Sequence, residues 1–109
     1  MLHFWRDQPH GPSLAEPEWD DIDNRFPAET ARLETHLRRV EAAASTTSWQ
    51  LSQATHVNPV PPDNLYWWGV RGVGAFYLYD GTDLAIVLVG VETNPPSWID
   101  LRDMARNRV

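Results

Sequence analysis

The last third of the sequence holds its strongest hydrophobic pattern: three apolar, aromatic-rich runs separated by short glycine-containing turns. Short turns of this kind join neighbouring antiparallel strands. In the second run, period-two alternation places Phe76 and Leu78 on one face of the sheet and Tyr77 on the other. The third run is apolar on both faces, which suits the centre of a sheet. The predicted strands are 65–71, 75–79 and 84–92, with turns at 72–74 and 80–83.

A different period marks a helix over residues 28–44. Arg32, His36 and Arg39 fall on a face of it away from the apolar one. These three could contact a phosphate, but we expect a solvated helix face. The apolar positions recur at spacings of four, three and four residues, which forms one stripe: Leu33, Leu37, Val40 and Ala44.

Weaker patterns flank this helix. Residues 2–5 could form a short first strand, and residues 16–23 are compatible with a short amphipathic helix around Trp19 and Ile22. After Pro95 and Pro96, a C-terminal helix is predicted, and Ser97 with Asp100 resembles a capping box at its start. We expect Trp98, Leu101 and Ala105 to pack on the sheet and the arginines of this helix to face outward.

These elements predict one α+β domain over residues 1–109. A helical N-terminal part and loop (1–63) precede an antiparallel sheet with a C-terminal helix (64–109), and the N-terminal helices pack on the small sheet. Residues 45–64 are polar and then proline-rich, so we expect a long connection. His56 within it is the one imidazole near conceivable chemistry, although a surface histidine without a role is the better expectation.

Charge is distributed unevenly along the chain. The formal net charge of −6 argues against binding nucleic acid by bulk electrostatics. All nine basic residues are arginines, which suit forked contacts with carboxylate or phosphate, although a genome that favours arginine is the better explanation. Acidic residues come early and arginines late: Glu16, Glu18, Asp20, Asp21 and Asp23, then Arg102, Arg106 and Arg108.

Several classes of protein are disfavoured by composition. There is no cysteine, and no apolar run approaches the roughly 20 residues of a membrane helix. The N-terminus lacks the order of a signal peptide. We therefore expect a cytoplasmic protein that makes no membrane contact.

The usual chemical motifs are missing. The four histidines have no paired spacing, and the glycines around position 72 have no following lysine, so we expect neither a metal nor a cofactor. What remains is Arg71 at the end of the first strand, Tyr77 on the second, and the arginines of the last helix. Aromatics beside arginines can stack bases and hold phosphates, but aromatic residues are also common strand residues.

The order of these pieces from residue 64 to residue 109 resembles the C-terminal half of the RelE/ParE-like toxin superfamily, in its phage-derived Gp49-like and HigB-like branch. That family has a helical pair where this chain has the helix 28–44. The matching pieces are Val70-Arg71, Ala75-Phe76-Tyr77, Asp80-Gly81, the aliphatic run 85–91, Thr93-Asn94-Pro95-Pro96, and the arginine-bearing helix 99–108.

The resemblance implies a toxin of a toxin–antitoxin or phage-derived module, acting as a ribosome-dependent mRNA endonuclease. Arg71 with Arg102 or Arg106 would hold phosphate, and Tyr77 would position a base. The implied partners are an antitoxin-like protein, the ribosome or mRNA, and a homodimer is left open. Two departures bear on activity, because Gly74 stands where the family carries an arginine, and Val91 and Glu92 stand where it carries lysines.

A second hypothesis is non-enzymatic. A catalytically degenerate member of the same fold would bind a protein partner through its aromatic surface and its acidic segment. The carboxylates of that segment could mimic phosphates and occupy the protein's own arginines or those of a partner.

Overall fold

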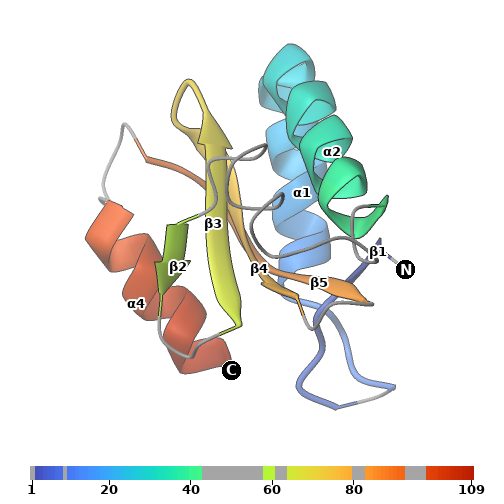
Figure 1. The fold of residues 1–109 in the computed structure, drawn as a ribbon, viewed down its shortest axis with the longest axis vertical. Helices are drawn as coiled ribbons and strands as arrows, with labels where there is room; N and C mark the ends of the chain where they lie inside the picture. Colours follow the sequence, from blue (N-terminus) through green and yellow to red (C-terminus); the bar gives the residue numbers. More distant parts are fainter. Residues whose placement is uncertain (1, 9, 43–57, 61–63, 80–82, 93–97) are drawn as a thin grey trace.

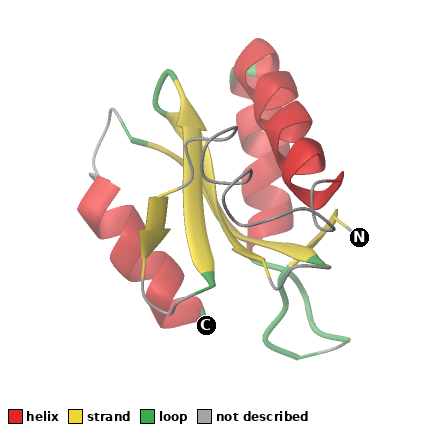
Figure 2. Cartoon of the chain, viewed as in Figure 1, coloured by secondary structure: helices red, strands yellow, loops and turns green. Residues whose placement is uncertain are grey.

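The computed structural model describes residues 2–8, 10–42, 58–60, 64–79, 83–92 and 98–109 (Figures 1 and 2). The elements in this described part follow the order strand, two helices, four strands, helix. They are β1 (Leu2–Phe4), α1 (Ala15–Arg25), α2 (Pro27–Ala42), β2 (Asn58–Val60), β3 (Leu65–Val70), β4 (Val73–Tyr79), β5 (Leu84–Val91) and α4 (Trp98–Arg108).

The sheet has five strands in the order β1-β5-β4-β3-β2. Strands β2 to β5 pair in antiparallel fashion, as predicted for β3 to β5, but β1 pairs in parallel with β5. The sheet is therefore mixed, and the prediction of an antiparallel sheet is wrong for this edge. Parallel neighbours need a crossover connection, and here the chain runs through both N-terminal helices and three strands before it reaches β5.

Helices cover both faces of the sheet (Figure 1), and the fold is α+β as predicted. α1 and α2 lie on one face, with a core that contains Leu33, Leu37 and Tyr77. α4 lies on the other face, over a core that contains Phe76 and Leu101. The predicted alternation along β4 is confirmed, because neighbouring residues belong to opposite cores. β5 contacts both α1 and α4, which explains why it is apolar on both faces.

Local hydrogen bonds set the bounds of the N-terminal helices. The Oγ of Ser13 accepts from the backbone N–H groups of Ala15 and Glu16, at 3.2 and 3.3 Å, and so satisfies donors at the start of α1. Phe26 separates α1 from α2, and Pro27 occupies the first turn of α2, where the missing N–H costs nothing. The whole acidic segment, residues 16–23, therefore lies within α1.

The long predicted connection contains a strand. β2 pairs with β3 in spite of Pro59, and it lies at the edge of the sheet, where proline is tolerated. His56 lies outside the described residues, as does the predicted capping residue Ser97. None of the described helices combines the length and the apolar character required to cross a membrane.

Candidate functional site

Arg71 lies in the tight turn between β3 and β4, not at the end of a strand as predicted. Both Arg71 and Gly72 have positive φ angles, of 52° and 82°, as a two-residue hairpin turn of type I′ requires. The Arg71 side chain is 76% exposed, and its Nη1 atom lies 3.8 Å from Oε1 of Glu29 on α2. The hairpin tip therefore presents a cation beside the first turn of α2 (Figure 1).

This turn is shorter than the predicted one at residues 72–74, so Gly74 lies inside β4, paired with Gly69. Both glycines lie under the indole ring of Trp67. A Cβ atom at Gly74 would lie 2.5 Å from Cη2 of Trp67, and one at Gly69 would lie 2.8 Å from its Cζ2. Because no side chain fits at position 74 in this arrangement, glycine there is explained by the packing of Trp67.

Tyr77 is fully buried, so its side chain is not placed on the surface, where the implied role of positioning a base would need it. Its ring centroid lies 5.9 Å from that of Tyr66 and 6.5 Å from that of His36. The hydroxyl has no hydrogen-bond partner among the residues that the structure describes. Burial above all, with Tyr66 and Tyr79 adding to it, raises the pKa of Tyr77 far above its usual value. Its hydroxyl is therefore a neutral group in the core.

His36 is buried as well, which corrects the prediction that it shares a solvated face with Arg32 and Arg39. Its ring stacks on Trp68 of β3, with centroids 4.1 Å apart and planes 9° from parallel. Both arginines are exposed, so the three side chains form no single face. His36 instead belongs to the contact between α2 and the sheet.

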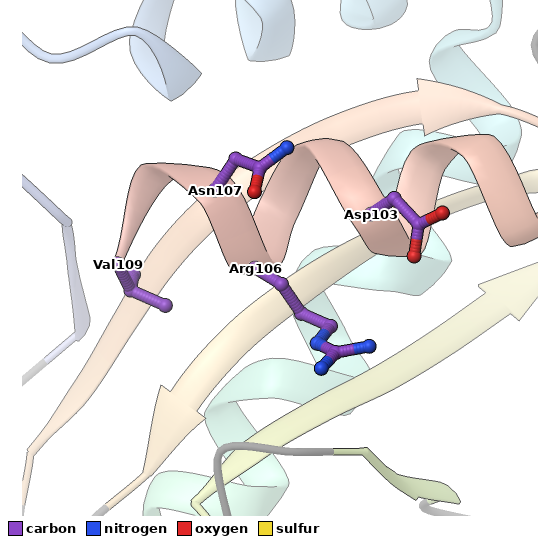
Figure 3. Close-up of a pocket in the computed structure, with 4 residues that line it drawn as sticks. All are labelled: Asp103, Arg106, Asn107 and Val109. Atoms are coloured by element: carbon purple, nitrogen blue, oxygen red, sulfur yellow. The ribbon is translucent and has the colours of Figure 1, made fainter.

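Of the two predicted arginines of α4, Arg106 is exposed, whereas Arg102 is half-buried and does not face outward as predicted. The guanidinium carbon of Arg102 lies 5.5 Å from the ring centroid of Trp98, within reach of a cation–π interaction. Its Nη2 atom lies 3.4 Å from Oδ1 of Asp103. Arg106 is exposed and lines an open surface pocket (Figure 3) with Asp103, Asn107 and Val109.

The four predicted site residues do not share one surface. Tyr77 lies in the core under α1 and α2, whereas Arg102 and Arg106 belong to α4 on the opposite face of the sheet. Arg71 lies at the hairpin tip beside α2. The structure brings together only Arg102 and Arg106, as neighbours one helical turn apart.

One contact joins the acidic segment to an arginine of α4, as the second hypothesis allowed, although the sequence did not indicate which residues would pair. Glu18 of α1 and Arg108 of α4 form a bidentate ion pair, with Nη1–Oε1 and Nη2–Oε2 distances of 2.8 Å. Their side chains are only 28% and 15% exposed, so Arg108 does not face outward as predicted. One sequence signal indicated that Glu18 is partly buried, because it shares a helical face with the buried residues Ala15 and Ile22.

The rest of the acidic segment faces solvent. Glu16, Asp20 and Asp23 recur at spacings of four and three residues, so they form one exposed stripe along α1. Glu16 lies 3.6 Å from Arg6, and the neighbouring Asp21 pairs with Arg25 at 3.0 Å. Within the described part of the chain, Asp20 and Asp23 make no ion pair. We call Glu16, Asp20 and Asp23 the acidic stripe.

No three histidine, aspartate or glutamate side chains of the described residues are placed to share a metal ion. No protein-family model, curated protein or solved structure matches the chain. Any proposal about function must therefore be argued from the geometry of the acidic stripe, of the hairpin tip and of α4.

Proposed function

We propose that this chain is a non-enzymatic protein-binding module, and that the acidic stripe of α1 is its contact surface. The proposal is supported by one observation above all. Three carboxylates are exposed on one face of a helix that is anchored in the core through Ala15 and Ile22 on another face. The helix is held against the core, and the carboxylates of Asp20 and Asp23 make no ion pair among the described residues.

The chemistry of this surface suits a protein with a basic segment. The chain carries a net charge of −6, so its field attracts cationic partners, and it does so more strongly at low ionic strength. A partner segment with several arginines would match this surface.

The aromatic surface named in the second hypothesis is not part of this proposed contact surface. Tyr77 and Trp67 are buried, and Trp68 stacks on His36. The acidic segment therefore has two parts with different roles. Glu18 holds one of the protein's own arginines, as the phosphate-mimic hypothesis allows, and the acidic stripe remains for a partner.

Binding to an arginine-rich peptide tests this proposal. Calorimetry would compare the wild-type chain with Asp20→Asn/Asp23→Asn. Glu34→Lys on α2 is the control, because it changes the net charge by the same two units. We expect the double substitution to weaken binding by at least about tenfold, which is 1.4 kcal/mol, and the control to weaken it far less. Equal effects of both variants, or no binding by the wild-type chain, would contradict the proposal.

A second candidate function is the toxin-like mRNA endonuclease that the resemblance implies. Its support is the exposure of Arg71 and Arg106, both of which are free to reach a large ligand such as the ribosome. Against it stand the burial of Tyr77 and the packing of Trp67 over Gly74. Growth arrest that depends on Arg71 would favour this candidate over the binding module.

A further inference from the structure

The edge of β5 is only partly covered by β1. The pairing ends at Phe4 and Ile86, where the N–H of Trp5 donates to the carbonyl of Ile86 at 2.8 Å. Among the described residues, no strand pairs with β5 on this side from Val87 to Val91, and we call this stretch the free edge of β5. Free strand edges are templates for pairing with another chain.

A bulge changes which backbone groups face this edge. On the β4 side, Phe76 pairs with Leu88 and Tyr77 pairs with Ile86, which leaves Val87 without a partner residue on β4. An extra residue of this kind changes the direction in which the following N–H and C=O groups point. The carbonyl of Val87 and the N–H of Val89 are thereby both directed to the free edge.

The Glu18–Arg108 pair occupies these two groups. Arg108 Nη1 donates to the Val87 carbonyl at 2.8 Å, and Glu18 Oε1 accepts from the Val89 N–H at 3.2 Å. A single residue of a parallel neighbouring strand would engage the same two groups, the carbonyl before Leu88 and the N–H after it. The ion pair therefore takes the place of the strand residue that would follow β1.

We propose that the Glu18–Arg108 pair seals this edge of β5 against strand pairing with a second copy of the chain. The occupant follows from the segment itself, because Val87-Leu88-Val89-Gly90-Val91 is apolar, rich in β-branched residues and the same in every copy. Two such edges can pair antiparallel about a two-fold axis. This inference does not depend on the proposed function, because it concerns a different side of α1.

Sedimentation velocity over a range of concentrations tests the seal. We expect Arg108→Ala and Glu18→Gln to raise the association constant at least about tenfold over the wild-type value. Hydrogen exchange at the Val89 amide should become faster in the dilute variants and slower again as they associate. Glu34→Gln and Arg38→Ala are matched controls, because they break an exposed ion pair of the same residue types on α2.

Exchanging the two charges distinguishes two roles of the ion pair. In one, the pair blocks the backbone groups at the edge of β5; in the other, it only holds α1 and α4 together. Glu18→Arg/Arg108→Glu restores the attraction but places a carboxylate against the Val87 carbonyl and a guanidinium against the Val89 N–H. If the pair blocks the edge, this double variant should still associate more strongly than the wild-type chain. If the pair only holds the two helices together, its association constant should equal the wild-type value. Where circular dichroism shows that Arg108→Ala does not fold, Glu18→Gln decides. Folded variants that associate no more than the wild-type chain overturn the proposal.

Discussion

The indole of Trp67 lies so close to the Cα of Gly74 that a Cβ atom at position 74 would come within 2.5 Å of its Cη2. The same Cβ would lie 2.5 Å from the carbonyl oxygen of Trp68. The backbone cannot yield as a flexible side chain would, so relief would require a shift of β3 against β4. The arginine that the resembled family carries at this position therefore does not fit at position 74.

Gly74→Ala should therefore destabilise the protein by about 1–3 kcal/mol through overpacking. Urea denaturation followed by tryptophan fluorescence measures this. Gly11→Ala is the control, because the nearest contacts of a Cβ there are at an ordinary 3.4 Å, and we expect a change within about 0.5 kcal/mol. Equal stability of the two variants would show that Trp67 does not close position 74.

Tyr77→Phe should leave the protein as stable as before or more stable by about 1 kcal/mol. The substitution removes a buried hydroxyl that has no hydrogen-bond partner among the described residues, and with it the cost of desolvating that group. Thermal denaturation measures the change, with the half-buried Tyr66→Phe for comparison. A loss of 1 kcal/mol or more would mean that the hydroxyl makes a stabilising hydrogen bond.

The raised pKa of Tyr77 predicts a loss of stability in alkali. The folded state keeps the proton above a pH of about 10, whereas the unfolded chain releases it there. The unfolded state then binds fewer protons, so the free energy of unfolding falls as the pH rises beyond about 10. Tyr77→Phe should flatten this part of the stability profile. An unchanged slope would contradict the burial of an ionisable group at this position.

Arg108→Ala should cost about 1–3 kcal/mol of stability, because it leaves both the Glu18 carboxylate and the Val87 carbonyl without their charged donor. Arg38→Ala should cost about 0.5 kcal/mol or less, since its pair with Glu34 is exposed. Denaturant titrations of both variants at one salt concentration give the comparison. Similar losses would show that the Glu18–Arg108 pair stabilises no more than a surface ion pair.

Much of the fold could be predicted from the chain itself. The stripe through Leu33, Leu37 and Val40 is buried as its spacing indicates, and the alternation of Phe76 and Tyr77 correctly divides the two cores. Such patterns repeat locally, so they can be recognised without knowing the partners of each residue.

Other features depend on residues far apart in the sequence. Glycines at 69, 72 and 74 left the position of the turn open, and only the pairing with β3 shows that Gly74 makes room for Trp67. Arg108 looked like part of a solvated face, because its partner Glu18 lies 90 residues earlier. The parallel pairing of β1 with β5 has no local signal for the same reason. The candidate site residues were chosen by resemblance, and the structure separates them on two faces of the sheet.

The central claim is that this chain acts by binding and not by cleaving RNA. Mapping new RNA ends after induced expression tests it most directly, with Arg71→Ala and Arg106→Ala expressed to the same level and checked for folding. We predict that the wild-type chain produces no more RNA ends than either variant. New ends in mRNA, accompanied by growth arrest and abolished by Arg71→Ala or Arg106→Ala, would contradict the claim and establish the endonuclease.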